Sequence, residues 1–250
     1  MRIISTLISA TVAIALFGSV LMASETQKAH WGYTGHGSPD KWASLSPDNE
    51  MCGMGKNQSP INVASSLDAD LEIISPVYTR SSTDILNNGH TIQVNMEPGS
   101  SLSIDGMAFD LKQFHFHAPS ENHIEGKSFP LEAHFVHLDR DGNIAVLALM
   151  FEDGEKNEQL EKIWNHMPKI ANEKLSIKLK DAAGSLLPKN KDYYRFNGSL
   201  TTPPCTEGVR WIVLKTPVTI SKDQVAKFLT IMEHPNNRPI QTINSRVIVE

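Results

Sequence analysis

The stretch from Gln113 to His137 constrains the fold more than any other part of the chain. It holds five of the ten histidines, and at both of its ends two kinds of side chain alternate from one residue to the next, as they do in β-strands. Because alternate residues of a strand share a face, His115 and His117 point one way and the phenylalanines Phe114 and Phe116 the other. If the following segment, LEAHFVHL, pairs antiparallel with this strand, His134 lies beside the first two histidines. The pattern therefore predicts three imidazoles that converge on one point.

Three protein nitrogens with a fourth position left open are typical of a catalytic zinc, whereas structural zinc sites are closed by four protein ligands. Gln113 and Glu132 each stand two residues before one of the histidines, on the same face, as hydrogen-bond acceptors for ligand rings do. A histidine in a strand is more often an ordinary core or surface residue, and H-x-H occurs by chance. The pattern alone leaves both interpretations open.

The composition is that of an ordinary globular protein. The chain has 250 residues, of which 40% are hydrophobic and 20% charged, enough for a sizeable core in one large domain or two small ones. The net charge of −5 and the pI near 6.1 give no basic surface, so nucleic acid is excluded as a partner.

Residues 1–23 have the features of a secretory signal peptide. Arg2 supplies the positive start, no charge follows until Glu25, and small residues end the apolar run. A run of this length also permits a transmembrane anchor, but serines, threonines and glycines dilute it, which favours cleavage. The mature chain is then residues 24–250, without a membrane segment.

The rest of the sequence predicts a mostly β (α+β) fold in a single domain, since no linker divides it. Segments 155–167 and 221–232 show helical spacing, and the second begins with a capping box, Ser221-x-x-Gln224. Residues 29–62 form an irregular segment anchored by Trp31 and Trp42. Beyond the histidine strands, extended structure is expected at 61–63, 71–74, 85–88, 91–96, 101–104, 144–151, 199–214 and 247–249.

Several motifs occur together in one order along the chain: NQSPINV (57–63), NNGH (87–90), the histidine stretch (113–137), NGSLTTPPCTEGVRW (197–211) and NRPIQTINSR (237–246). With them, the chain from His30 onward resembles an α-class carbonic anhydrase of the exported bacterial type. The resemblance implies a central twisted mixed, largely antiparallel sheet with a few short peripheral helices. It places a zinc at the base of a cone-shaped cleft.

The resemblance implies a zinc metalloenzyme that catalyses the reversible hydration of carbon dioxide to bicarbonate and a proton, by attack of zinc-bound hydroxide. An esterase side activity belongs to the same family. The zinc ligands would be His115, His117 and His134. Thr201 would accept the hydroxide proton and donate its own to Glu121, because a hydroxyl both donates and accepts.

Further positions match the family's substrate pocket and its path for the proton. Apolar and small polar residues would line the pocket: Val136, Val146, Leu200, Thr202 and Trp211. His90 matches the proton-shuttle position, although an NGH sequence is first of all a turn signal. Tyr33, Asn88 and Gln93 match positions along the shuttle's water network, and Gln93 departs from the asparagine common in the family.

The two cysteines, Cys52 and Cys205, are an even number in a chain bound for an oxidising compartment. The exported bacterial members of the family carry a similar bridge, which supports a disulfide, and two free buried thiols are the alternative. A periplasmic or secreted location follows from the predicted signal. The exported relatives are often dimers, so a homodimer is an expectation.

Two rival functions can be told apart from this one. A binding module with the same fold would have lost the zinc, yet all three histidines are present together with Glu121 and Thr201. A general zinc hydrolase of esters or phosphates would carry an H-E-x-x-H helix or a second, carboxylate-rich metal site, and the sequence has neither. A nucleophilic serine also lacks support, since no G-x-S-x-G occurs.

Overall fold

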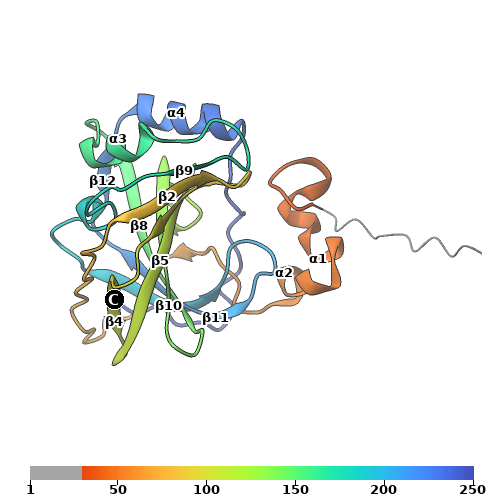
Figure 1. Cartoon of the computed structure of the whole chain (residues 1–250). Helices are drawn as coiled ribbons and strands as arrows, with labels where there is room; N and C mark the ends of the chain where they lie inside the picture. The colour runs from red at the N-terminus through yellow and green to blue at the C-terminus, as the bar shows by residue number, and fades with distance from the viewer. Residues whose placement is uncertain (1–29) are drawn as a thin grey trace, which may run out of the picture.

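The computed structural model describes residues 30–250, so the predicted signal peptide lies outside the described residues. Ten strands form one twisted sheet (Figure 1), in the order β10-β11-β8-β7-β5-β3-β2-β9, with β12 paired to β8 and β4 paired to β5. The strands are β2 (Ser82–Asn87), β3 (Ile92–Met96), β4 (Ser101–Ile104), β5 (Met107–His117), β7 (Leu131–Leu138), β8 (Ile144–Asp153), β9 (Lys174–Ser176), β10 (Tyr193–Ser199), β11 (Glu207–Leu214) and β12 (Val218–Ile220).

The sheet is mixed but largely antiparallel. Within it β8 pairs in parallel with β11 and with β12, and the other neighbours pair antiparallel. A separate small sheet joins β1 (Asn62–Val63) to β6 (His123–Ile124) in parallel. The prediction of a mostly β, single-domain fold built on a mixed sheet is confirmed.

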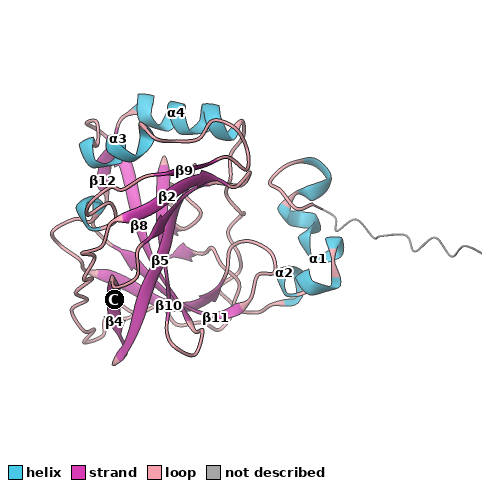
Figure 2. Ribbon diagram, viewed as in Figure 1, coloured by secondary structure: helices cyan, strands magenta, loops and turns pink. Residues whose placement is uncertain are grey.

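Helices are few and lie at the periphery (Figure 2). They are α1 (Trp42–Leu45), α2 (Met51–Met54), α3 (Glu158–Trp164) and α4 (Lys222–Met232), with single 3-10 turns at Gly35–Gly37, Pro39–Lys41, Pro47–Asn49 and Gly184–Leu186. The predicted capping box of α4 is present, since the Ser221 and Gln224 side chains each accept from the other's backbone N–H. Helix α3 is shorter than predicted, because Asn157 accepts from the N–H groups of Gln159 and Leu160 and so fixes its start.

The phenylalanine face of β5 and β7 is packed into the main core. Phe114, Phe116 and Phe135 are fully buried, and each such side chain contributes roughly 1.5–3 kcal/mol on burial. Trp164 of α3 packs edge-on against Phe116, with ring centroids 4.7 Å apart, and Phe228 of α4 lies against Trp164. The two helices thus cover one face of the sheet, which leaves the histidines on the other.

Three of the expected strands are wrong. At 247–249 only isolated bridges form, from Val249 to Leu67 and to Arg195. Residues 71–74 form no strand, because they run along the surface, lining a pocket, without a ladder partner. The segment 199–214 is not continuous: Tyr193–Ser199 and Glu207–Leu214 are separate antiparallel strands. The loop between them contains Pro203 and Pro204, and proline offers no N–H to a ladder.

The N-terminal segment packs against the body of the protein through tryptophan and a disulfide. Trp42 is fully buried and clusters with Cys52 and Cys205, and the Arg238 guanidinium lies 5.6 Å from its ring centroid. Its indole N–H donates to the carbonyls of Gly32 and Gly37, within the same segment, at 2.9 and 2.8 Å. Cys52 in α2 is bonded to Cys205, which lies in the loop between β10 and β11. The predicted pairing is confirmed, and it joins this loop covalently to the N-terminal segment.

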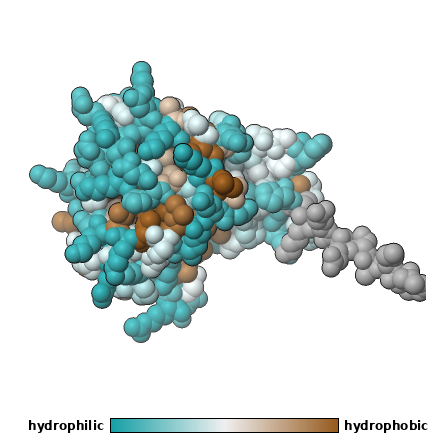
Figure 3. Space-filling view, turned by 45° about the horizontal axis from the view of Figure 1, so that its top comes forward, coloured by the Kyte–Doolittle hydropathy of each residue, from teal (hydrophilic) through white to brown (hydrophobic). Residues whose placement is uncertain are grey.

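The surface is mostly hydrophilic on the face shown in Figure 3, with limited apolar areas. The large apolar side chains that remain exposed are Met54, Leu67, Ile73, Val77, Ile170, Leu175, Ile240 and Val247. Within residues 30–250, none of the helices has the length and apolar character needed to cross a membrane.

Candidate metal centre

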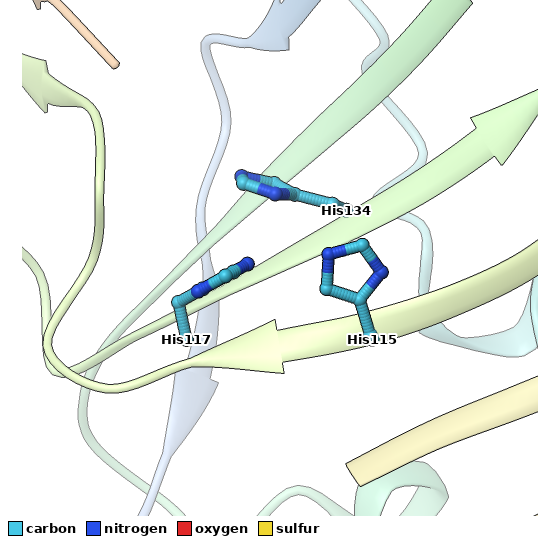
Figure 4. A group of neighbouring side chains, drawn as sticks. All are labelled: His115, His117 and His134. Carbon is cyan, nitrogen blue, oxygen red and sulfur yellow. The ribbon is translucent and has the colours of Figure 1, made fainter. Parts of the chain in front are cut away.

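Three histidines from two neighbouring strands face one another (Figure 4). The expected antiparallel pairing of β5 with β7 sets His115 directly opposite His134 and His117 opposite Glu132. One ring nitrogen from each histidine can be chosen so that the three atoms all lie within 4.8 Å of one another. In the described part of the chain no other group of three or more histidine, cysteine or carboxylate side chains meets this condition.

In each ring one nitrogen donates a hydrogen bond to an acceptor, and this determines which nitrogen is left to bind a metal. His115 Nδ1 donates to Gln113 Oε1 at 2.8 Å, and His117 Nδ1 donates to the carbonyl of Asn236 at 2.7 Å. His134 is turned the other way, with Nε2 donating to Glu132 Oε1 at 2.8 Å. The nitrogens left with lone pairs are therefore Nε2, Nε2 and Nδ1, a mixed set that the strand pattern alone does not specify.

The free nitrogens fit a metal better than they fit a packed core. His117 Nε2 and Glu121 Oε2 are buried without a hydrogen-bond partner, which is costly for polar atoms unless something else binds them. Burial lowers the pKa of all three histidines, and the rings next to one another lower it further at His115 and His134. The rings are thus neutral at pH 7, the form that ligates a metal, and three imidazoles with an open position suit zinc.

Glu132 is the most heavily hydrogen-bonded carboxylate at this site. Besides the His134 ring it accepts from the backbone N–H groups of Glu121 and Asn122, at 2.7 and 2.8 Å, and from the Asn122 side chain at 2.7 Å. Burial raises its pKa, and these donors oppose the rise. A carboxylate held by four donors cannot rotate, so the orientation of the His134 ring is fixed as well.

Glu121 lies beside the free nitrogens. Its Oε2 is 3.5 Å from His117 Nε2 and 3.9 Å from His134 Nδ1, while Oε1 accepts the backbone N–H of Arg238 at 2.8 Å. Burial raises the pKa of Glu121 to about 8, against the lowering effects of the Arg238 N–H and of Thr201. A dication at the histidines would lower this pKa by Coulombic attraction.

Two residues that hold this arrangement are not singled out by the sequence pattern. Asn236 accepts from His117 and also donates to the carbonyls of His90 and Phe116. The guanidinium of Arg238, only 2% exposed, donates to the backbone carbonyls of Cys52 and Ser59, at 2.8 and 2.7 Å, and to the side-chain Oε1 of Gln58 at 2.9 Å. Both lie at or beside the motif NRPIQTINSR, which is the only sequence signal that could have indicated them.

An apolar wall stands beside the histidines. Val136, Val146 and Trp211 are cross-strand neighbours in one row over β7, β8 and β11. The Trp211 ring meets His134 edge-on at 4.9 Å, and the partly buried Leu200 packs on the same cluster. Thr202 follows Thr201 in the loop after β10 and is half-buried, whereas Thr201 is 5% exposed.

Of the predicted shuttle residues, His90 and Tyr33 line a separate, open pocket of about 240 Å³, whereas Asn88 and Gln93 are not among its lining residues. The His90 ring stacks on Trp31, with centroids 3.7 Å apart and planes at 9°. Asn88 Oδ1 accepts from the backbone N–H of His90 at 2.9 Å, which is the turn that its sequence suggests. Gln93 donates to Asn95 at 2.7 Å and reaches the Asn88 amide only at 3.5 Å.

The other histidine in β7 belongs to the core. His137 is fully buried on the phenylalanine face, where its Nε2 meets the Tyr78 hydroxyl at 2.7 Å. Burial lowers its pKa to about 4, so this ring is neutral.

Comparison with known proteins agrees with this site. Residues 37–250 match the family model of eukaryotic-type carbonic anhydrases. A carbonic anhydrase of Pectobacterium carotovorum is 50% identical over 95% of this chain and 98% of its own, and one of Neisseria gonorrhoeae is 50% identical over 91% and 90%. The solved α-carbonic anhydrase of Thermovibrio ammonificans, in complex with the inhibitor sulfanilamide, superposes with a TM-score of 0.87 at 50% identity, over 89% of this chain and 99% of that one.

The three convergent neutral imidazoles, together with the family match, identify a zinc enzyme of the lyase class. The chain belongs to the α-carbonic anhydrase family. Its activity is that of a carbonic anhydrase, and its cofactor is zinc.

Removal of the Gln113 side chain tests whether its hydrogen bond orients the His115 ring. We expect Gln113→Ala to weaken zinc binding about 10- to 100-fold, as loss of such partners does in zinc enzymes, this family included, because the His115 ring loses its acceptor. Competition with a chromophoric chelator measures the affinity. The control is Lys112→Ala, an exposed neighbour in β5 whose side chain pairs with Asp110 instead of a histidine. Equal affinity in both variants would show that Gln113 does not orient the ligand.

Proposed function

We propose that this chain catalyses the reversible hydration of carbon dioxide at a zinc held by His115 Nε2, His117 Nε2 and His134 Nδ1. The observation that carries the proposal is the set of three neutral ring nitrogens without other partners, all within 4.8 Å. The acceptors on the far side of each ring support the choice of these atoms. Carbon dioxide is proposed as the substrate because the chain belongs to the carbonic anhydrase family.

When bound by these three neutral rings, zinc would keep its full positive charge and would supply a nucleophile at neutral pH by acidifying water. Thr201 orients that nucleophile: its hydroxyl accepts one hydrogen bond and donates its own proton toward Glu121. The backbone N–H of Arg238 holds the Glu121 carboxylate at the other oxygen. A lone pair of the nucleophile is then directed at the substrate.

Carbon dioxide is small and apolar, so it is bound by the apolar wall of Val136, Val146, Leu200 and Trp211, with Thr202 at its edge. This wall begins at the His134 ring, since Trp211 meets that ring directly. A substrate against this wall would lie beside the three histidines, where the nucleophile would attack its carbon. Exclusion of bulk water there strengthens the electrostatic interactions of the site.

Turnover also requires export of a proton, and a histidine at the open pocket is the carrier in this proposal. The resemblance gives that role to His90, with Tyr33, Asn88 and Gln93 along the path. Burial and the nearby His30 and His234 lower the pKa of His90 to about 4, so its ring is neutral at pH 7 and ready to accept. A ring with so low a pKa is protonated in only a small fraction of molecules at pH 7, and this limits the proton flux that His90 carries.

An esterase side activity is a second, weaker proposal for the same site. An activated ester presents a carbonyl carbon that the same nucleophile would attack as it would attack carbon dioxide. Loss of the two activities in parallel, on removal of a zinc ligand, would mark them as reactions of one centre.

Thr201→Ala tests the proposed function. We expect kcat/KM for carbon dioxide hydration to fall about 10²-fold, as when one oriented hydrogen bond is lost from a transition state, because the nucleophile is no longer aligned. Stopped-flow hydration with a pH indicator measures it, together with zinc content. Zinc should stay at one equivalent, since Thr201 is not a ligand.

Two further variants make this test specific. Thr201→Ser keeps the hydroxyl and should retain most of the activity, and Thr206→Ala removes an exposed threonine of the same loop. If Thr201→Ala matched the parent, or if serine failed to rescue, the orienting role would be wrong.

We also propose that the chain is exported, with residues 1–23 removed and 24–250 forming the mature enzyme in the periplasm or the medium. The Cys52–Cys205 bond supports an oxidising compartment. The mass of the chain recovered from the periplasm and the medium tests this: a full-length mass would contradict cleavage. The homodimer suggested by the family stays a prediction.

A further inference from the structure

The side chain of Gln58 lies buried between Arg238 and the loop that carries Thr201. It is only 4% exposed, although glutamine is a residue of the surface in most proteins. Its Oε1 accepts from the Arg238 guanidinium at 2.9 Å, and its Nε2 donates to the backbone carbonyl of Cys205 at 3.0 Å. A buried amide that is hydrogen-bonded at both ends holds its two partners at a fixed separation.

The partners determine which way this amide points. A guanidinium only donates hydrogen bonds and a backbone carbonyl only accepts them, so the amide oxygen faces Arg238 and the amide nitrogen faces Cys205. The same nitrogen also donates to Glu207 Oε1 at 3.0 Å. Rotation of the Gln58 amide by half a turn would therefore lose all three hydrogen bonds.

Gly55 leaves the space that this amide occupies. A Cβ atom at position 55 would collide with Gln58 Nε2 and with Glu207 Oε1, as well as with a backbone carbonyl of α2. The backbone of Gly55, at φ −59° and ψ 150°, has a conformation that alanine adopts without strain. The glycine is thus required by the close approach of its neighbours, which include the amide of Gln58.

The loop on the nitrogen side of this amide is compact. The N–H of Leu200 donates to the carbonyl of Thr206 at 2.9 Å. The N–H of Cys205 donates to the carbonyl of Thr202 at 2.8 Å. Thr201 lies inside the turn that these bonds close, and Cys205 itself is fully buried. A shift of the Cys205 carbonyl is therefore passed on to Thr201.

Arg238 connects the oxygen side of the amide to the metal site. Its backbone N–H donates to Glu121 Oε1 at 2.8 Å, and its guanidinium donates to the carbonyl of Cys52 at 2.8 Å. Because Cys52 is bonded to Cys205, the contacts form a closed cycle, from Arg238 to Cys52, across the disulfide, and back through Gln58. Glu121 is attached to this cycle at Arg238, and the loop between β10 and β11 is attached to it at Cys205.

We propose that Gln58 is a positioning residue of the hydration reaction, which sets the place of the Thr201 loop relative to the Glu121 carboxylate. This rests on the proposed function, in which the Thr201 hydroxyl donates its proton toward Glu121 while it orients the nucleophile. Gln58 acts through the Cys205 carbonyl on one side and through Arg238 on the other. Loss of the amide lets the two groups move apart, and a misplacement of about 1 Å can cost ~10²-fold in rate.

The test separates the two ends of the amide with Gln58→Glu and Gln58→Met. Glu keeps an oxygen for the Arg238 guanidinium but has no N–H for the Cys205 carbonyl, and Met has a similar length without either hydrogen bond. In stopped-flow hydration we expect kcat/KM to fall about 10-fold in both variants, less than in Thr201→Ala, because the nucleophile is misaligned but keeps its partner. Zinc should stay at one equivalent. The control is Asn57→Ala, which changes an exposed neighbour.

A double-variant cycle with Thr201→Ala shows whether Gln58 acts through that residue. Gln58→Glu should lower kcat/KM about 10-fold in the parent but less than about 2-fold once Thr201 is alanine. A general loss of structure would lower it equally in both backgrounds. Oxygen-18 exchange at chemical equilibrium adds a second distinction, since the interconversion of carbon dioxide and bicarbonate should slow while the release of labelled water, which depends on proton transfer, is unchanged.

Hydrogen–deuterium exchange gives a readout that does not depend on activity. The backbone N–H groups of residues 200–206 should exchange faster in both Gln58 variants, while those of β5 and β7 keep their parent rates. Parent kcat/KM in both variants, equal losses with and without Thr201, or faster exchange throughout the chain would overturn the proposal. A Thr201→Ala variant as active as the parent would instead overturn the proposed function, so the two failures are distinct.

Discussion

Replacing His134 by alanine should remove the bound zinc and with it the hydration of carbon dioxide. His134 supplies one of three proposed protein ligands, and its ring is fixed by Glu132. Zinc sites with four protein ligands bind with about 10–16 kcal/mol, so one ligand is worth roughly 3–4 kcal/mol, or on the order of 10²- to 10³-fold in affinity. Alanine also leaves the Glu132 carboxylate with a buried, unused acceptor position. Elemental analysis of the purified protein and stopped-flow hydration measure the two losses.

The matched control for this variant is His166→Ala, which removes an exposed imidazole that makes no contact with the site. Circular dichroism checks that both variants are folded. Full zinc occupancy in the His134 variant would show that the ligand assignment is wrong. A parent protein that binds no zinc at all would instead favour a binding module on the same fold.

Exchanging both cysteines, Cys52 and Cys205, for serine should lower the free energy of unfolding by about 5 kcal/mol. The bond joins residues 153 positions apart, and restricting so long a loop in the unfolded chain is worth this much in the chain-entropy model. Since most domains have only about 5–15 kcal/mol in total, a large share of the stability is at stake. Equilibrium unfolding in urea, without reductant, measures the difference.

The double variant is compared with the reduced parent, which carries two thiols instead of two hydroxyls and should be destabilised to a similar extent. Non-reducing peptide mapping of the parent should yield one linked pair through Cys52 and Cys205. A double variant as stable as the oxidised parent would mean that the bond contributes no net stability to this fold.

The histidine strands could be predicted from the sequence because their order is local. Alternation over residues 114–117 and 131–138 fixes which side chains share a face, and antiparallel pairing then sets the register between them. Helix α4 was equally legible, since its capping box lies within four residues. In both cases the signal and the structure occupy the same short segment.

The parts that could not be predicted depend on distant partners. All three residues of strand β9 are exposed, and it forms because β2 pairs with it, whereas residues 71–74 have similar strand character but no strand partner. Asn236 reaches His117 across 119 positions, and the Arg238 N–H reaches Glu121 across 117. A single sequence shows what each residue can bind, but not which remote group the fold brings to it.

The bond between Cys52 and Cys205 closes a covalent ring of polypeptide. This ring contains every strand from β1 to β10, including the two strands that carry the three convergent histidines. A protease that cuts one peptide bond inside this ring opens the chain without dividing it. The nicked enzyme keeps its mass, apart from one added water, until a reductant separates the pieces. An intact band on a non-reducing gel is therefore no proof of an intact backbone, and the loops within the ring can be cleaved while the metal-site strands stay tethered to each other.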